Sequence, residues 1–416
     1  MTRSKPRKLE LVLPAGDLNK ARFAFNYGAD ACYGGLAKYS LRKAEVDFNL
    51  VTLKKAIDLA HCLGKKFYIT FNIFARNYNL KTLESDIKKI SKFKPDAFIV
   101  SDPGIINFIK KNSLIPIHLS TQANTTNWQS VKFWKEQGIK RIVLARELTL
   151  KEIQEIRIKV PGIELEIFVH GAMCISYSGR CLLSATMTGR EANQGNCAQP
   201  CRWQYKIKNQ KFLLEEEKRP GEYFEISEDK EGTYIMNSKD LRLIKYLPDI
   251  ANAGVVGLKV EGRNKSEYYL STITGAYRKA VNAFYDGKFK KILPDVLRET
   301  EKIAHRDYTT GFLFNDAKDG EIYKDRHPIE NYKFLGVLTQ NKVQWHKLIA
   351  RNQIKVQDNV EVLTPDGFYN DKVEEIIDIS GERLVVVNPR PPQEFIKIRL
   401  NKNYPANSML RKINSI

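Results

Sequence analysis

The sequence predicts a (β/α)8 barrel of the TIM type followed by a small all-β barrel domain. Over about 280 residues, short apolar runs alternate with amphipathic helical stretches, as in parallel strands that helices cover on the outside. After Tyr332 the helical period disappears, and strand-like runs separated by turn residues follow. A doubly wound open sheet is the alternative for the first part, but eight strand–helix units close naturally into a barrel.

Eight short apolar runs are predicted as the parallel strands. In chain order they are Leu9–Leu13, Asp30–Tyr33, Lys66–Asn72, Ala97–Ser101, Ile117–Ser120, Arg141–Ala145, Leu165–Val169 and Val255–Val260. In a barrel the carboxyl ends of these strands meet at one face, where such folds have their active sites. Residues that directly follow the strands are therefore the first candidates for a functional site.

The helices between the strands are predicted from apolar residues at a period of 3.6 and from capping residues such as Asp17. They are Leu18–Tyr27, Leu50–Leu63, Leu80–Phe93, Asn124–Gln137, Thr149–Lys159, a helix from Asn237 or Ser238 to about Ala253, and Lys265–Tyr285, which would close the barrel. Two cysteines, Cys32 in the second strand and Cys62 in the second helix, are predicted as small core residues.

The predicted domains follow from these elements. Residues 1–290 form the barrel, with a cysteine loop at 174–201 and an inserted, highly charged flap at 202–233. Residues 291–331 connect it to a β-barrel domain at 332–416. The strands expected in that domain are Phe334–Thr339, Lys347–Ala350, Asn359–Leu363, Val373–Ile379 and Leu384–Val387.

The chain of 416 residues is strongly basic, with 68 Lys+Arg against 48 Asp+Glu and a formal net charge of +20. This charge indicates a polyanionic partner, and nucleic acid is the first candidate. The alternative is a lysine-rich solvated surface without a partner. No apolar run approaches the roughly 18 residues of a membrane span, and the N-terminus has no apolar signal core. We expect a cytoplasmic protein with reduced thiols and no membrane partner.

Four of the six cysteines lie close together in the sequence. Cys174, Cys181, Cys197 and Cys201 have the spacing C-x6-C-x15-C-x3-C. Two disulfides, a zinc site and a cubane iron–sulfur cluster are the chemical explanations, and packing of one or two thiols is the simplest alternative. Four-cysteine zinc sites usually use C-x2-C pairs, whereas iron–sulfur clusters tolerate less regular spacings, so the pattern favours a cluster.

The residues around the first two cysteines form a long signature: Glu166-x-Phe168-x-x-Gly171-Ala172-Met173-Cys174-x4-Gly179-x-Cys181-x-Leu183-Ser184. It resembles the signature of the peptidase U-32 family, the "collagenase-like" proteases. The resemblance covers nearly the whole chain, including a small C-terminal domain. It implies a 4Fe–4S cluster bound by cysteines of this loop, for which Cys174, Cys181, Cys197 and Cys201 are our candidates.

Within the family, the sequence resembles the tRNA 5-hydroxyuridine synthesis proteins. This resemblance implies O2-independent 5-hydroxylation of the tRNA wobble uridine, with prephenate as hydroxyl donor and a second subunit of the family as a further partner. Hydroxylation of rRNA or of ubiquinone is the first alternative, and a U-32 peptidase is the second. Neither H-E-x-x-H nor G-x-S-x-G occurs, so proteolysis would depend on Cys174 with His170 as its base.

Three candidate catalytic residues follow strands of the predicted barrel. His170 could hydrogen-bond a cluster sulfur or act as an acid or base, or it could be a structural histidine. Glu261 and Arg263 follow the eighth strand, where Gly262 lets a ligand approach the backbone. Arg263 could bind a carboxylate or a phosphate. The alternative is a Glu–Arg pair between strands.

The candidate substrate-binding residues are Asn72, Gln122, Asn127, Arg146 and Tyr308. The amides of Asn72, Gln122 and Asn127 could read a base edge or a ribose, although capping of loops is the alternative for all three. Arg146 follows the sixth strand and resembles Arg263 in position. Tyr308, in a Tyr/Thr/Gly loop, could cover the pocket.

Overall fold

The structure is a computed structural model. It describes residues 8–41, 48–174, 176–181, 183–188, 190, 192–194, 196–202, 238–314, 328–342, 344–389, 391 and 394–414, together with four short strands between residues 213 and 234. The chain forms two compact units. The first contains residues 1–25, 29–265 and 306–328, and the second contains residues 26–28, 266–305 and 329–416.

The first unit is a closed barrel of parallel strands. In chain order these strands are β1 (Glu10–Pro14), β2 (Ala31–Gly34), β3 (Lys66–Phe71), β4 (Ala97–Val100), β5 (Ile117–Leu119), β6 (Arg141–Val143), β7 (Glu164–Ala172) and β13 (Gly257–Val260). Each strand pairs in parallel with the next, and β13 pairs with both β7 and β1. The ring therefore closes, as predicted from the sequence.

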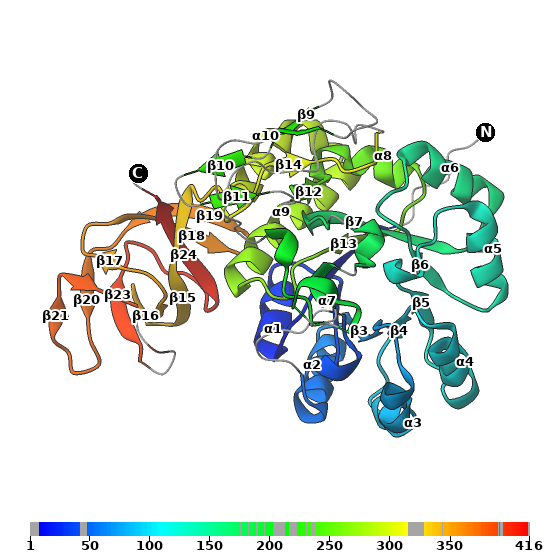
Figure 1. The fold of residues 1–416 in the computed structure, drawn as a ribbon. Coiled ribbons are helices and arrows are strands. Elements are labelled where there is room, and N and C mark those ends of the chain that lie inside the picture. The colour runs from blue at the N-terminus through cyan, green and yellow to red at the C-terminus, as the bar shows by residue number, and fades with distance from the viewer. Residues whose placement is uncertain are drawn as a thin grey trace. The chain divides into compact units, whose positions relative to one another are not determined.

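Helices surround this ring of strands (Figure 1). They are α1 (Leu18–Asn26), α2 (Leu50–Cys62), α3 (Asn77–Ser91), α4 (Pro103–Asn112), α5 (Trp128–Glu136), α6 (Leu150–Lys159) and α8 (Leu247–Asn252). The sequence analysis missed α4, although Asp102 caps it and Pro103 occupies its first turn. Cys32 is buried as predicted, but the prediction for Cys62 was wrong, because this last residue of α2 is exposed.

Two further strands extend the sheet beside β7. The strand β12 (Asp240–Arg242) pairs antiparallel with β7, and β14 (Tyr308–Thr309) pairs with β12. The helix predicted to start at Asn237 or Ser238 is therefore shorter, because the chain first forms β12. Within the predicted flap, β8 (Leu213–Glu215) pairs with β9 (Tyr223–Glu225), and β10 (Ser227–Asp229) pairs with β11 (Gly232–Tyr234). The rest of the flap lies outside the described residues.

The second unit contains α9 (Glu267–Tyr285), α10 (Phe289–Thr300) and an antiparallel β-structure. Its eight-stranded sheet has the order β19-β18-β24-β15-β16-β23-β20-β21. The strands are β15 (Tyr332–Lys342), β16 (Trp345–Ala350), β18 (Asn359–Thr364), β19 (Gly367–Lys372), β20 (Glu375–Ile377), β21 (Arg383–Leu384), β23 (Ile396–Arg399) and β24 (Ser408–Ile413). A separate pair joins β17 (Ile354–Lys355) to β22 (Val386–Val387).

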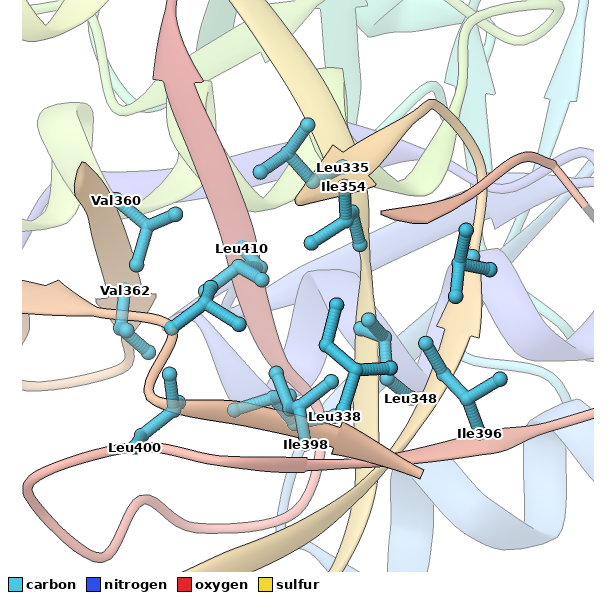
Figure 2. Close-up of a cluster of buried hydrophobic side chains, with 14 of the residues drawn as sticks. Leu335, Leu338, Leu348, Ile354, Val360, Val362, Ile396, Ile398, Leu400 and Leu410 are labelled. Carbon is cyan, nitrogen blue, oxygen red and sulfur yellow. The ribbon is translucent and has the colours of Figure 1, made fainter. Parts of the chain in front are cut away.

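Branched apolar side chains from these strands form the core of the second unit (Figure 2). On β16 and β23 the buried and more accessible positions alternate, as expected for strands with one face toward a core. The all-β prediction is thus confirmed. The predicted strand Val373–Ile379 begins in the turn between β19 and β20, and β17, β19, β23 and β24 were missed.

None of the helices in the described residues is long and apolar enough to cross a membrane.

Candidate functional site

The cysteine loop leaves the carboxyl end of β7 beside the end of β13. Gly171 has a φ of +110°, and a Cβ there would lie 2.5 Å from the carbonyl oxygen of Glu261. Only glycine fits this conformation and this close approach without strain. The backbone at Gly171 therefore directs the cysteine loop over the end of the barrel that carries the strand carboxyl termini.

Hydrogen bonds attach the cysteine loop to neighbouring loops of the same barrel end. Arg180 donates from Nη2 to the carbonyl oxygen of Gln122 over 2.9 Å. Ser178, with a φ of +42°, donates from its hydroxyl and its backbone N–H to the carboxylate of Glu147. These bonds fix the loop to the segments that follow β5 and β6. The signature region is thus an integral part of the barrel mouth.

A cavity of about 500 Å³ opens beneath this loop, and we call it the outer cavity. Three of the four loop cysteines line it, namely Cys174, Cys197 and Cys201. The opposite part of the lining comes from the segment after β13. The lining also includes Arg190, Asn196, Glu261, Gly262, Arg263 and Lys265. The outer cavity therefore combines thiols with a surplus of basic side chains.

The donor set of the loop fits a thiolate-bound cluster in its chemistry. All six cysteines are free of disulfides, and the four loop cysteines are partly accessible. Cys174 Sγ lies 2.9 Å from Ser176 Oγ, whereas Cys181 makes backbone bonds to the side chain of Asn193 and is not among the residues that line the outer cavity. Within the described parts of the chain, no three His, Cys, Asp or Glu side chains gather closely enough to hold a metal. Binding of a cluster would thus require all four thiols, including Cys181, to come closer together than they are in this structure.

A second, smaller cavity of about 50 Å³ lies within the barrel, and we call it the inner cavity. Four predicted site residues line it: Asn72, Gln122, Arg146 and Glu261. Asn72 Nδ2 lies 3.4 Å from Gln122 Oε1. Glu261 also lines the outer cavity. The structure thus brings residues from the ends of four different strands to one polar chamber.

Arg146 and Arg263 occupy defined positions at these cavities. Arg146 donates from Nη1 to the carbonyl oxygen of Ala172 over 3.1 Å, and its guanidinium lies 4.1 Å from the centre of the Phe168 ring. Arg263 is buried and donates from Nη2 to the carbonyl oxygen of Gly35 over 2.7 Å. Gly262, whose φ is +145°, permits the turn that leads from the end of β13 to Arg263.

His170 and Tyr308 lie together, and neither is among the residues that line the two cavities, although the carbonyl oxygen of His170 accepts a hydrogen bond from the backbone N–H of Glu261. His170 is buried on β7, and its ring centre is 5.6 Å from that of Tyr308 on β14. The guanidinium of Arg242 lies over the Tyr308 ring, 4.1 Å from its centre. The packing agrees with the structural alternative for His170, and its catalytic role stays a prediction.

Asn127 is not brought to either cavity. It is exposed and precedes α5, where its side-chain oxygen accepts a hydrogen bond of 2.9 Å from the backbone N–H of Ser130. This is the geometry of a helix N-cap. The capping alternative therefore describes Asn127 better than the predicted role in substrate binding.

We expect Asn127→Ala to lower the free energy of unfolding by about 1 kcal/mol through loss of this cap. Activity on the substrate should stay unchanged at a temperature where the variant is folded. Thermal unfolding and steady-state kinetics would measure the two effects. Asn72→Ala is the matched comparison, because it removes an amide from the inner cavity. If Asn127→Ala lost as much activity as Asn72→Ala, Asn127 would have to be counted as a substrate-binding residue.

The sequence analysis missed Lys259 as a site residue. This lysine lines the inner cavity from β13, and its ammonium lies 4.2 Å from the ring centre of Tyr33. A lysine in the otherwise apolar strand Gly257–Val260 was a usable signal, because an unpaired charge is rarely buried. Its acidic partner, Glu166, lies in another apolar strand, and no local pattern relates the two.

Fold and site together define a TIM-type barrel with an active site at its mouth. The chain belongs to peptidase family U32. Residues 16–322 match the domain described as Peptidase family U32, and residues 330–411 match the Peptidase family U32 C-terminal domain. The resemblance inferred from the cysteine signature is thereby confirmed.

Similar proteins extend over most of the chain. The tRNA hydroxylation protein P of Haemophilus influenzae is 43% identical over 416 residues, covering 90% of this chain and 90% of that protein. The tRNA hydroxylation protein P1 of Bacillus subtilis is 37% identical over 418 residues, covering 98% and 95%. An rRNA 5-hydroxycytidine synthase of Escherichia coli is 30% identical, covering 96% of this chain and 60% of that protein.

Proposed function

We propose that this protein is a tRNA hydroxylase that converts a wobble uridine to 5-hydroxyuridine without O2. The observation that best supports this proposal is the full-length similarity to proteins named for tRNA hydroxylation, at 37–43% identity. The net charge of +20 suits a tRNA partner. A base must leave its stack before it can react, and the outer cavity, at about 500 Å³, offers room for one.

We propose further that Cys174, Cys181, Cys197 and Cys201 hold a 4Fe–4S cluster. Three of these thiols line the outer cavity, and the fourth lies in the same loop. When bound, such a cluster supplies one-electron transfer chemistry. The basic side chains beside the thiols, Arg190, Arg263 and Lys265, would offset the negative charge of a thiolate-bound cluster or of RNA phosphate.

The proposed hydroxyl donor is prephenate, a small organic acid. The inner cavity contains hydroxyl and amide groups of Thr70, Ser120, Thr121, Asn72 and Gln122, which suit a small polar ligand. At about 50 Å³ the inner cavity has room for a carboxylate group but not for a whole nucleotide or a whole prephenate molecule. The rest of the acid would extend past Glu261, which lines both cavities.

Hydroxylation of rRNA is the second candidate, supported by the similarity to the rRNA 5-hydroxycytidine synthase. Mass spectrometry of total tRNA and rRNA from a strain lacking the gene separates the two. The tRNA proposal requires loss of one oxygen atom from the wobble uridine of specific tRNAs, restored by the intact gene. Unchanged tRNA together with an rRNA base that has lost an oxygen atom would replace the proposal with the second candidate.

A further inference from the structure

Lys259 is a fully buried ammonium that faces the inner cavity. Its side chain is 4% exposed, and Nζ donates to Glu166 Oε1 over 2.8 Å. The rings of Tyr33 and Phe168 lie beside it, with centres 4.2 Å and 5.8 Å from Nζ. Lys259 is thus held between one carboxylate, two aromatic rings and the cavity.

Glu166 is in turn held in place by a second cation, Arg141. Arg141 Nη1 lies 3.0 Å from Glu166 Oε2 and 2.6 Å from Glu10 Oε1. Arg141 is buried, and Tyr68 donates from its hydroxyl to the same Glu10 oxygen. Charges therefore alternate along a chain inside the barrel, from Glu10 through Arg141 and Glu166 to Lys259. Such a chain is costly to desolvate, so its net contribution to stability is small.

The donor capacity of Lys259 exceeds what the protein supplies. An ammonium has three N–H donors, and Glu166 accepts one of them among the described residues. Burial lowers the pKa of Lys259, and Glu166 compensates this only in part. The carboxylate of Glu166 stays ionised, because Lys259 and Arg141 outweigh the effect of burial and hold its pKa below the usual value. The remaining donor capacity of Lys259 is therefore available at the cavity.

The cavity limits what can accept these hydrogen bonds. At about 50 Å³ it holds a few atoms, so a nucleotide or an RNA phosphate with its sugars does not fit. Its polar lining includes Thr70, Ser120 and Gln122, and the guanidinium of Arg146 is a second cation there. Ammonium and guanidinium groups bind carboxylates through short, charge-assisted hydrogen bonds. Glu261 is a carboxylate in the same lining, and the two cations outnumber it. The size, polarity and charge therefore match a carboxylate group of a small acid, with the rest of that acid lying outside the inner cavity.

We propose that Lys259 binds a carboxylate of a small organic acid in the inner cavity, and that Glu166 is a positioning residue that holds the ammonium in place. The identity of the acid as the hydroxyl donor rests on the proposed function. The binding site itself rests on the cavity and on the chain of buried charges.

Isothermal titration of the full-length protein with prephenate tests this proposal without relying on turnover. We expect Lys259→Met to weaken prephenate binding by about 10- to 100-fold, because a hydrogen-bonded ion pair is lost. Binding of tRNA, measured in parallel, should stay the same. Lys140→Met, which removes an exposed lysine next to Arg141, is the matched control and should leave both affinities unchanged.

A second variant separates loss of binding from loss of folding. Lys259→Met alone leaves Glu166 without its lysine and could unfold the barrel. The double variant Glu166→Gln with Lys259→Met removes both charges and keeps the shapes close to the original. It should fold and still bind prephenate weakly. Wild-type affinity in either folded variant would overturn the proposal, as would a wild-type protein that binds neither prephenate nor the simpler acids pyruvate and malonate.

The role of Glu166 is tested by the pH dependence of prephenate binding. Several charged or titratable groups surround Lys259: Glu166 on β7, Arg141 on β6, His118 on β5, Glu10 on β1, Tyr33 on β2, and Arg146 and Glu261 at the strand ends. Glu166→Gln removes the carboxylate that favours the ammonium, so the pKa of Lys259 should fall further. As the pH is raised, the Lys259 ammonium of the variant should lose its proton earlier, so prephenate binding should weaken at a lower pH than in the wild type. An unshifted pH profile would show that Glu166 has only a structural role.

These measurements distinguish the inference from the proposed function. A wild-type protein that binds prephenate through Lys259 but produces no hydroxylated tRNA would support the binding site and refute the tRNA activity. A wild-type protein that hydroxylates tRNA, with a prephenate affinity that Lys259→Met leaves unchanged, would support the tRNA activity and refute the binding site.

Discussion

Replacing Cys174 with Ser should remove iron from the anaerobically purified protein and abolish tRNA hydroxylation. A serine hydroxyl stays protonated where a cysteine becomes a thiolate, so it is a poor ligand for a soft iron–sulfur site. Cys174 lines the outer cavity with Cys197 and Cys201, and the same result is expected for each. Iron and sulfide analysis, absorbance in the visible range and mass spectrometry of tRNA would measure it.

Cys62→Ser is the matched control. This cysteine is exposed at the end of α2 and lies outside the cysteine loop, so its replacement should change neither iron content nor activity. A Cys174→Ser protein that keeps full iron and full activity would refute the assignment of Cys174 as a ligand. Cleavage of peptides that Cys174→Ser abolishes would instead support the peptidase alternative.

The sequence was most informative where function requires a local pattern. Four cysteines within one loop and the motif around Gly171 identify the mouth without any three-dimensional information, because their spacing is itself the signal. The parallel strands were found for a similar reason: each is a short apolar run between turn residues. Asn127 shows the limit of this approach. An asparagine before a helix has the same sequence pattern whether its amide caps the helix or contacts a ligand.

Contacts between distant segments could not be predicted. Lys259 and Glu166 are 93 positions apart, and Arg141 and Glu10 are 131 apart. Each of these residues lies in or at the start of a mainly apolar strand, but which charge meets which depends on strand register in the closed barrel. The prediction for Cys62 failed because the buried face of α2 runs through Leu53, Ala56, Ile57 and Ala60, and Cys62, two positions after Ala60, lies on the opposite side of the helix.

The second unit also contains a buried charge, on its last strand, whose partners could not be predicted from the sequence. Arg411 on β24 has a fully buried side chain, with 0% exposed. Its Nε donates to Glu361 Oε2 over 2.9 Å, and its Nη2 donates to Glu299 Oε2 over 3.0 Å. Lys302 Nζ lies 2.7 Å from the same Glu361 oxygen. Arg411 thus joins α10 to the β-sheet within this unit.

Arg411→Met should lower the free energy of unfolding of this unit by about 3 kcal/mol, because Glu299 and Glu361 lose a fully buried cation and are left to share Lys302. Hydrogen exchange of the backbone amides in β18 and β24 would measure the loss where it occurs. Lys412→Met is the matched control: Lys412 pairs with Asp358 at a partly exposed site, so its loss should cost at most about 1 kcal/mol.

The pH dependence of this difference provides a stricter test. Burial acts to raise the pKa of Glu361, but Lys302 and Arg411 outweigh it and hold the pKa below the usual value. The stabilisation from this carboxylate is therefore complete above the unfolded pKa of about 4.3 and is lost as the pH falls through the lower folded value. The gap between wild type and Arg411→Met should be widest near neutral pH and narrow in acid, because protonated carboxyl groups no longer need the guanidinium. A gap that stays constant from neutral pH into acid would mean that Arg411 stabilises the unit by packing against its neighbours and not by charge.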